Sequence, residues 1–231
     1  FFYQPAQKLY QLLISPALGD LQANQIRTLV FVLDGSLRNI PMNSLYDGKQ
    51  YLIEQYNVAL TPGLQLLSPR SLQDLKLKIL AAGITKAKDE FSALNNVKEE
   101  LKAIKKNLSS VILLDRDFTS QNLQEKIEFS NFSIVHIATH GQFSSKLADT
   151  FLLAWDDRIS IDKLDRLLRK KVNTRDRAIE LLVLSACETA SGDKKAALGL
   201  AGMAIKAGAR STLATLWSVN DRASAELMNR F

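Results

Sequence analysis

With 231 residues, of which 46% are hydrophobic, the chain is long enough to bury a substantial core as one large domain or two small ones. No apolar stretch approaches the roughly 20 residues that cross a bilayer, which argues against a membrane protein. The net charge of +6 comes from basic residues spread over many segments, without the interleaved aromatics of a single-strand binder, so solvated helix faces are favoured over a nucleic-acid surface.

Short apolar runs alternate with helical patterns along the chain. Strands are predicted at residues 27–34, 77–83, 111–115, 133–139, 179–186 and 211–217, with a pair of short strands around a turn at 51–60 and another short strand at 151–157. Helices are predicted at residues 95–108, 119–129, 160–168, 197–209 and 221–231. Most of the strands are apolar on both faces, which is typical of a parallel sheet covered on both sides. The alternation predicts an α/β fold with a mainly parallel sheet and helices on both faces.

Neither end of the chain looks like the boundary of a complete protein. The first residues lack an initiator Met and the basic and apolar regions of a signal peptide, and the last residues fall within a helical pattern. We therefore expect a piece of a longer protein, cut short at its carboxyl end. The single cysteine, Cys187, has no partner for an internal disulfide or a Cys-rich zinc site, which indicates a reducing, cytoplasmic setting.

Two of the predicted strands end in residues that can carry out chemistry. The strand over 133–139 leads to His140 and Gly141, and the strand over 179–186 leads to Cys187. The carboxyl ends of parallel strands share one edge of an open α/β sheet, where active sites form. If the two strands are neighbours, the imidazole of His140 and the thiol of Cys187 meet above this edge.

A thiol beside an imidazole is suited to nucleophilic catalysis. Cysteine with its ordinary pKa of about 8.5 is only slightly ionised at neutral pH, and a nearby imidazole raises the fraction of reactive thiolate. The same imidazole can later protonate a leaving amine. Gly141 leaves room for a substrate carbonyl beside its backbone N–H, so the N–H groups of Gly141 and Cys187 are candidates for an oxyanion hole.

Simpler interpretations of the same residues exist. A lone cysteine after an apolar run is often a small buried hydrophobe, but the His-Gly pair at a second strand end favours a catalytic Cys187. His136 lies in the middle of its predicted strand and is interpreted as a core or supporting residue. Residues four apart on a strand are separated by about 13 Å, so His136 and His140 are not expected to share a metal ion. No G-x-S-x-G, G-x-G-x-x-G or phosphate-loop motif occurs.

Three segments in the second half of the chain, read in order, resemble the CHAT family of caspase-like domains, which are often attached to tetratricopeptide repeats. They are IVHIATHGQFSS, LLVLSACETASGD and LGLAGMAIKAGARSTLATLWSVND. Upstream, LRNIPMNSLYDGKQYLIEQYNVALTPGL and DRDFTSQNL are similar to the N-terminal half of that family. The spacing of His140 and Cys187 is close to the roughly 50 residues that separate the same pair in caspases.

The resemblance covers nearly the whole chain and implies a single domain over residues 1–231 with a caspase-hemoglobinase fold. It implies a non-catalytic half over about 1–118 and a catalytic half over about 119–231. It carries a Cys–His dyad onto Cys187 and His140 and implies a cysteine endopeptidase that cleaves protein substrates without a cofactor. Tetratricopeptide repeats or another regulatory region are the partners that it implies in the full-length protein.

Peptidases of this group take much of their specificity from the pocket for the residue before the cut. Near the predicted strand ends, the candidates for this pocket are Ser185, Asp156, Trp217 and Asp221. Turn and helix-cap roles are the alternative for the two aspartates, as core packing is for Trp217. Ser185 lies two residues before Cys187, where some relatives carry an acid that selects Arg or Lys, and serine cannot supply that charge.

Three functions are consistent with this sequence. The first is a cytoplasmic cysteine endopeptidase regulated by attached repeats or a partner. The second is a catalytically silent, caspase-like scaffold for protein–protein interaction, and the third is another thiol acyl-transfer enzyme such as an amidase. The presence of both His140 and Cys187 favours the first over the second, and a comparison of peptides with simple amides separates the first from the third.

Overall fold

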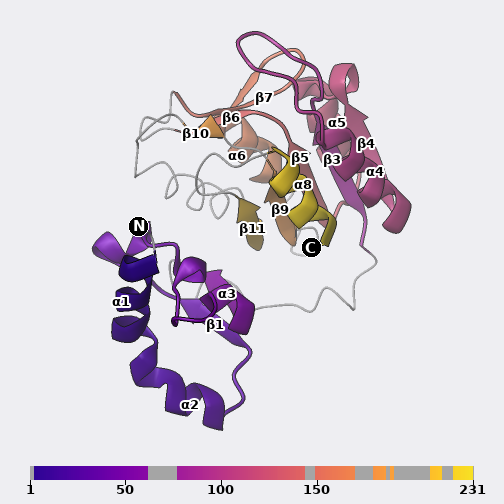
Figure 1. The fold of residues 1–231 in the computed structure, drawn as a ribbon. Coiled ribbons are helices and arrows are strands. Elements are labelled where there is room, and N and C mark those ends of the chain that lie inside the picture. The colour runs from indigo at the N-terminus through magenta and orange to yellow at the C-terminus, as the bar shows by residue number, and fades with distance from the viewer. Residues whose placement is uncertain are drawn as a thin grey trace. The chain divides into compact units, whose positions relative to one another are not determined.

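The computed structural model describes residues 3–61, 77–143, 149–169, 179–185, 188–189, 209–214 and 221–230. Backbone packing divides the chain into two compact units, residues 1–69 and residues 70–231 (Figure 1). The division near residue 118 into a non-catalytic and a catalytic half concerns function, and it stays a prediction.

The N-terminal unit combines helices with a small parallel sheet. Its elements are α1 (Tyr3–Leu13), η1 (Ser15–Ala17), α2 (Leu18–Ala23), β1 (Thr28–Phe31), η2 (Gly35–Asn39), η3 (Met42–Ser44), α3 (Leu52–Gln55) and β2 (Asn57–Leu60). β1 and β2 pair in parallel, with Leu29 beside Val58. Both of these side chains pack on a buried core formed by Tyr10, Ile14, Met42, Leu45 and Leu52.

The prediction of two short strands over residues 51–60 is wrong in its first half. There the chain forms the one-turn helix α3, because the carboxylate of Glu54 turns back and accepts the backbone N–H of Tyr51 at 2.6 Å. Leu52 is fully buried beneath this turn. Over so short a segment, an alternating apolar pattern does not distinguish a strand from one helical turn, and only β2 forms in the second half.

The turn before α3 depends on an ionised carboxylate. Asp47 accepts the backbone N–H groups of Gln50 at 2.8 Å and Lys49 at 2.6 Å, and these bonds hold the pKa of Asp47 below its ordinary value. Gly48, between Asp47 and Lys49, has a φ of 108°, a conformation that glycine adopts without strain. The stability that Asp47 contributes is therefore present above the ordinary aspartate pKa and is lost as the pH falls through the lowered value.

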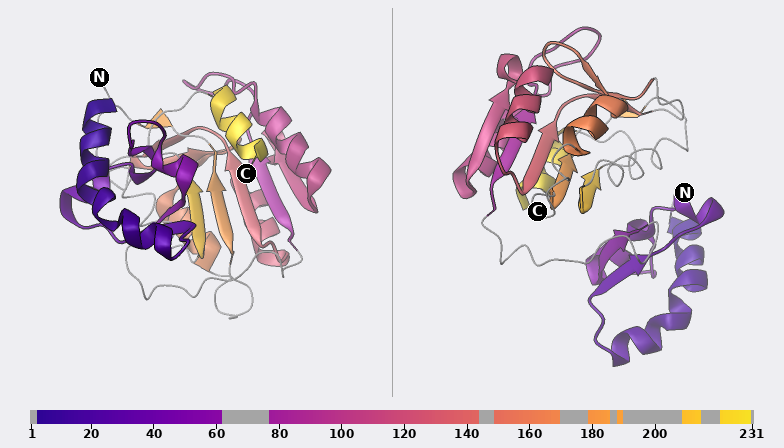
Figure 2. Two further views of the ribbon diagram at one scale, coloured as in Figure 1. Left: turned by 60° about the horizontal axis from the view of Figure 1, so that its bottom comes forward. Right: turned by 180° about the vertical axis from the view of Figure 1, so that it is seen from behind.

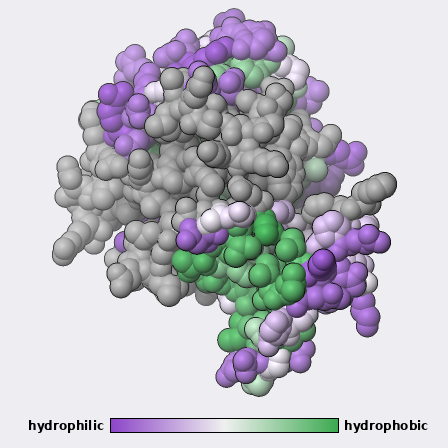
Figure 3. Space-filling model, turned by 90° about the vertical axis from the view of Figure 1, so that its left-hand side faces the viewer, coloured by the Kyte–Doolittle hydropathy of each residue, from purple (hydrophilic) through white to green (hydrophobic). Residues whose placement is uncertain are grey.

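An apolar surface is exposed on the N-terminal unit. Along β1, the exposed residues Thr28 and Val30 alternate with half-buried neighbours. Most of the exposed large hydrophobic side chains among the described residues belong to this unit, including Val30 and Leu60, each more than half exposed. Figure 3 shows hydrophobic side chains gathered into one patch. Parallel sheets are ordinarily covered on both faces, whereas the residues described in this unit leave Thr28 and Val30 of β1 exposed.

A five-stranded, all-parallel sheet forms the centre of the C-terminal unit. Its strands, in spatial order, are β11 (Ser211–Ala214), β9 (Leu181–Leu184), β5 (Ile134–Ala138), β3 (Ile79–Gly83) and β4 (Ser110–Leu114). Each strand coincides, to within one residue, with part of an apolar run for which the sequence predicts a strand. The predicted mainly parallel sheet is confirmed.

Helices cover both faces of this sheet (Figure 2). They are α4 (Val97–Asn107), α5 (Ser120–Phe129), α6 (Ile161–Arg169) and α8 (Asp221–Arg230), and the single turn η5 (Asp115–Asp117) precedes α5. α5 and α6 pack on the face that includes Leu80 and Val135, whereas α4 and α8 pack on the face that includes Ala81 and Ile134. The predicted α/β fold with helices on both faces is therefore confirmed. The predicted helix over 197–209 lies outside the described residues, except for its last residue.

A second sheet continues from two strands of the first. Its order is β10 (Glu188–Thr189), β6 (Gly141–Phe143), β7 (Phe151–Leu153) and β8 (Arg158–Ser160). β10 pairs with β6 in parallel, and the remaining pairs are antiparallel. β7 occupies the first part of the short strand predicted over 151–157, and a turn occupies most of the remainder.

A side-chain cap marks the start of α5 but not the start of α4. Thr119 precedes α5, and its hydroxyl accepts the N–H of Asn122 at 3.0 Å, as an N-cap does. Asn96 precedes α4 but has helical backbone angles and makes no side-chain cap hydrogen bond. The amide side chain is thus not what fixes the start of α4.

Gly83, at the end of β3, lies under α4 with no room for a side chain. A Cβ there would be 2.7 Å from Val97 Cγ1 and 2.8 Å from the backbone O of Ala138. We expect Gly83→Ala to lower the free energy of unfolding by about 2 kcal/mol, because the helix or the strand must shift. Chemical denaturation measures this change. Gly19→Ala is the control, since a Cβ at Gly19 meets nothing within 4 Å, and an unchanged midpoint for Gly83→Ala would contradict the packing of α4 on β3.

Candidate active site

The strands that lead to His140 and Cys187 are direct neighbours in the five-stranded sheet. β5 pairs with β9 in parallel, with Ile137 beside Leu184, so both strands end at the same edge. The prediction that the two strands are parallel neighbours is confirmed. Cys187 lies outside the described residues, and the distance between its Sγ and the imidazole of His140 stays a prediction.

The same pairing resumes beyond this edge. β6 begins directly after His140, β10 begins at Glu188, and the two pair in parallel with Gln142 beside Glu188. Before the gap in the described residues, the N–H of Ser185 donates to the backbone O of Ile137 at 2.9 Å. The chain is therefore paired with the region around His140 both before and after the candidate nucleophile.

His140 is held by two contacts from one loop. The residue is 8% exposed, and its ring stacks on Phe91 with 4.9 Å between the ring centroids and 28° between the planes. Its Nε2 lies 2.8 Å from the backbone O of Ser92. Because a carbonyl oxygen can only accept, Nε2 carries the hydrogen and donates it, which leaves Nδ1 of the neutral ring as an acceptor. The ring can therefore accept a proton at Nδ1.

The loop that holds His140 connects β3 to α4 over residues 84–96. The N–H of Leu94 donates to the backbone O of Thr85 at 3.1 Å, which closes the loop on itself. The N–H and hydroxyl of Thr85 both donate to the carboxylate of Asp115, at 2.7 Å and 2.9 Å, and this ties the loop to the end of β4. Asp115 has a φ of 50°, a conformation that aspartate tolerates better than most residues.

The hairpin of β7 and β8 supports the loop. Phe151 of β7 meets Phe91 edge to face, with 6.3 Å between the ring centroids. The guanidinium of Arg158 lies 4.4 Å from the centre of the Phe151 ring and pairs with Glu90 at 2.5 Å. The Phe91 ring, which stacks on His140, is therefore also in contact with β7.

Sequence reasoning missed Phe91 and Ser92. The contribution of Ser92 is a backbone carbonyl, whose position no residue type reveals. Phe91 follows the charged pair Asp89 and Glu90 in a polar loop. A single aromatic residue in such a loop is the one feature of the sequence that indicates a structural role for Phe91. Its burial, with 8% of the residue exposed, shows that this aromatic is part of the fold.

Gly141 presents a backbone donor beside His140. The residue is buried and lies opposite Leu152 of β7, and the neighbouring hydrogen bond runs from the N–H of Leu153 to the O of His140 at 2.8 Å. This places Gly141 and Leu152 in a non-hydrogen-bonded pair, so the N–H of Gly141 points away from β7. It therefore faces the side of β10, and its role as an oxyanion donor stays a prediction. The second predicted donor, the N–H of Cys187, lies outside the described residues.

His136 is buried within β5 and bonded to α4. Its Nε2 lies 2.6 Å from Oε1 of Glu100, and the two residues are 5% and 1% exposed. The interpretation of His136 as a core or supporting residue agrees with this placement. In the part of the chain that the structure describes, no three His, Cys, Asp or Glu side chains are grouped so that they could hold a metal ion.

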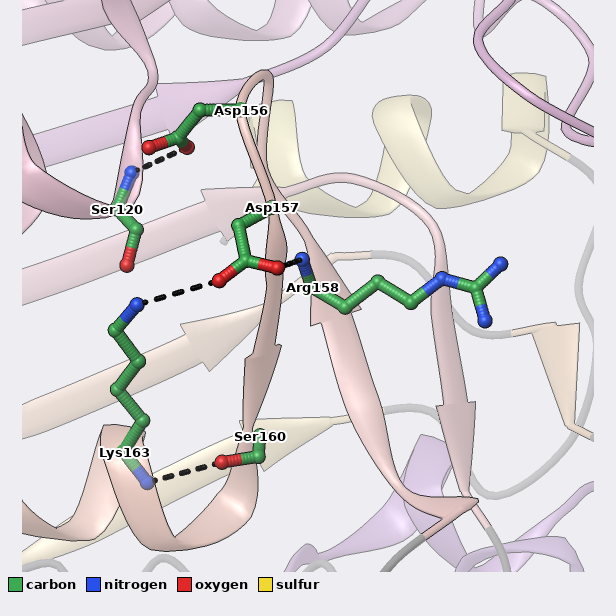
Figure 4. A network of polar contacts seen from close by, with 6 residues as sticks. All are labelled: Ser120, Asp156, Asp157, Arg158, Ser160 and Lys163. Atoms are coloured by element: carbon green, nitrogen blue, oxygen red, sulfur yellow. Dashed lines mark hydrogen bonds and ion pairs between the residues drawn. The ribbon is translucent and has the colours of Figure 1, made fainter.

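Asp156, a candidate pocket residue, is engaged at the start of α5. Its Oδ1 accepts the N–H of Ser120 at 2.7 Å (Figure 4). The adjacent Asp157 accepts the backbone N–H of Arg158 at 2.7 Å and lies 3.5 Å from Nζ of Lys163 at the start of α6. These bonds fix the turn between β7 and β8. A turn and cap role for Asp156 is thus present, and its part in substrate binding stays a prediction.

Ser185, another candidate pocket residue, contacts α8. Ser185 is buried at the end of β9, and its Oγ lies 3.3 Å from Oγ of Ser224 in α8. Asp221 is the first residue of α8, and Trp217 lies outside the described residues. A role of Ser185, Asp221 and Trp217 in a substrate pocket stays a prediction.

Comparison with known families gives a match to the CHAT domain over residues 3–231. The match includes both compact units and every residue of the candidate site. No curated protein matches the chain. Within the described ranges, none of the helices has the length and apolarity needed to cross a bilayer.

Proposed function

The chain belongs to the CHAT domain family, which is related to caspase-like peptidases, and from this premise we propose that it is a cysteine endopeptidase with His140 and Cys187 as its catalytic dyad. The observation that carries the proposal is the parallel pairing of β5 with β9, resumed in β6 and β10 across the same sheet edge. Cys187 is covalently joined to segments that run beside the chain of His140 on both sides of this edge.

In the proposed reaction, Nδ1 of His140 accepts the thiol proton of Cys187 while the carbonyl of Ser92 holds the opposite nitrogen. The thiolate attacks the carbonyl carbon of the scissile amide, so that a C–S bond forms and the C=O π electrons move onto oxygen. The N–H groups of Gly141 and Cys187 stabilise this oxyanion.

Collapse of the oxyanion then breaks the C–N bond, and the proton on Nδ1 passes to the leaving amine. The product of this step is a thioester between Cys187 and the acyl half of the substrate. A water molecule that gives its proton to Nδ1 attacks the thioester, releases the carboxylic acid half and restores the thiol. This chemistry requires no cofactor.

The same proposal includes the setting in which the enzyme works. Protein or peptide substrates suit an endopeptidase, and attached tetratricopeptide repeats or another regulatory region would present them or control access to the site. The single cysteine of the chain suits a reducing, cytoplasmic compartment, where a thiol nucleophile stays reduced.

Mass spectrometry of a proteome digest tests the proposed function. A proteome is incubated with the wild type or with Cys187→Ala, and the new peptide termini are mapped. We expect termini that appear only with the wild type and share a preferred residue before the cut. Hydrolysis of simple amides without cleavage of peptides would support an acyl-transfer enzyme instead. Identical digests from both proteins, in the full-length context with its regulatory region, would support a scaffold.

A further inference from the structure

We infer that the buried pair of Glu100 and His136 is a positioning device for His140, which acts through α4 and the loop over residues 84–96. The catalytic part of this inference rests on the peptidase function proposed above. The contact that it concerns, between His140 and Ser92, can be tested without any substrate.

The pair is a directional contact inside an apolar interface. Glu100 and His136 are almost fully buried, with 2.6 Å between Oε1 and Nε2. Around them α4 packs on the sheet through Val97 and Leu101, whose neighbours include Ile134. Apolar contacts have no preferred direction, whereas a short hydrogen bond fixes both distance and angle. Buried polar pairs are best attested as devices that fix register, and here the register is that of α4 on β5.

α4 in turn fixes one end of the loop that holds His140. Ser92 is separated from Val97, the first residue of α4, by a short segment. The other end of the loop is anchored by the sheet, where the N–H of Ile84 donates to the backbone O of Ala138 at 3.1 Å. A slide or rotation of α4 is therefore passed to Ser92. A displacement of about 1 Å takes the 2.8 Å contact between Ser92 O and Nε2 out of hydrogen-bonding range.

Stability and positioning can be separated at this pair. Replacing both partners of a buried hydrogen bond by apolar groups of similar shape can be nearly neutral or stabilising, so such a variant can fold well while it lacks the directional bond. If the pair only stabilised the fold, His140 would be unaffected in that variant. If the pair positions His140, the ring loses its fixed contact with Ser92.

The test is the double variant Glu100→Met/His136→Leu in the whole chain, labelled with nitrogen-15 histidine. The chain contains 2 histidines, so the double variant retains His140 as its single imidazole. The hydrogen on Nε2 is protected from exchange with water while Ser92 accepts it. We expect this hydrogen to exchange at least about tenfold faster in the double variant, in which the circular dichroism of the backbone stays that of the wild type.

Two matched variants serve as controls. Glu99→Gln changes an adjacent carboxylate that is exposed and pairs with Lys102, and it should leave the exchange at His140 unchanged. Glu100→Gln keeps an oxygen that accepts from His136, and it should retain the wild-type exchange. Faster exchange in Glu99→Gln as well would overturn the inference, because the effect would not belong to the pair.

Wild-type exchange at His140 in the folded double variant would overturn the inference. If the double variant does not fold, the single variant Glu100→Met gives the same comparison, with the His140 signal assigned from its absence in His140→Ala. If neither the double variant nor Glu100→Met folds, the pair is required for folding, and this result would also overturn the inference that it positions His140. Faster exchange in a protein without peptidase activity would support the positioning of His140 and count against the proposed function alone.

Discussion

Replacement of His140 by Ala should lower kcat/KM for peptide hydrolysis by about 10³-fold, because every proton transfer of the proposed reaction uses its Nδ1. Without the imidazole, the thiol of Cys187 is ionised to a smaller extent at neutral pH, and the leaving amine departs without a proton donor. The measurement is steady-state kinetics on a peptide chosen from the cleavage sites in the proteome digest, with Cys187→Ala as the baseline.

The variant also changes the packing of the site, and its stability has to be measured in parallel. His140 is buried and stacked on Phe91, so the Ala variant leaves a small cavity that should lower the free energy of unfolding by about 1–2 kcal/mol. Kinetics are therefore compared at a temperature where both proteins are folded. Activity of folded His140→Ala within tenfold of the wild type would contradict its role as base and acid.

Phe91→Ala is expected to reduce kcat by about 10- to 100-fold while His140 and Cys187 remain in place, because a ring that loses its stacking partner samples unproductive orientations. Phe91 is 8% exposed and contacts both His140 and Phe151, so the free energy of unfolding should also fall, by about 3 kcal/mol. Kinetics and chemical denaturation on the same preparation separate the two effects.

Phe129→Ala is the matched control for Phe91→Ala. Phe129 ends α5 and is 83% exposed, so its removal should change neither kcat nor the unfolding midpoint appreciably. Phe91→Leu restores apolar volume without an aromatic face and should recover more stability than activity. Wild-type kcat in folded Phe91→Ala would show that Ser92 alone is sufficient to orient the imidazole.

The sheet could be predicted from the sequence because its strands are buried on both faces. β3, β5 and β9 are buried at every residue, so each appears as an apolar run, interrupted only by His136 in β5. The polar residues after β5 and β9 then indicated one shared edge, and the pairing of these strands confirms it. This part of the site could be predicted because buried strands consist mainly of apolar residue types.

The missed features depend on backbone geometry and on short elements. β6 has three residues and β10 has two, which is too short for any periodicity to show. The bond from His140 to Ser92 uses a carbonyl that every residue possesses. Glu100 in α4 bonds to His136 in β5, which is 36 residues away in the sequence. Neither residue type indicates the other as its partner, so the pair could not be predicted.

The labelling of Cys187 by iodoacetamide as a function of pH tests the dyad most directly, because a thiol paired with an imidazole holds more thiolate at mildly acidic pH than a free thiol does. We expect the apparent pKa of labelling in the wild type to lie below the value of about 8.5 for a free cysteine, and we expect His140→Ala to move the profile back towards that value. The measurement is repeated with the full-length protein and its regulatory region, since a resting state can separate the pair. Slow labelling that is the same in wild type and His140→Ala under both conditions would contradict the dyad and support a scaffold.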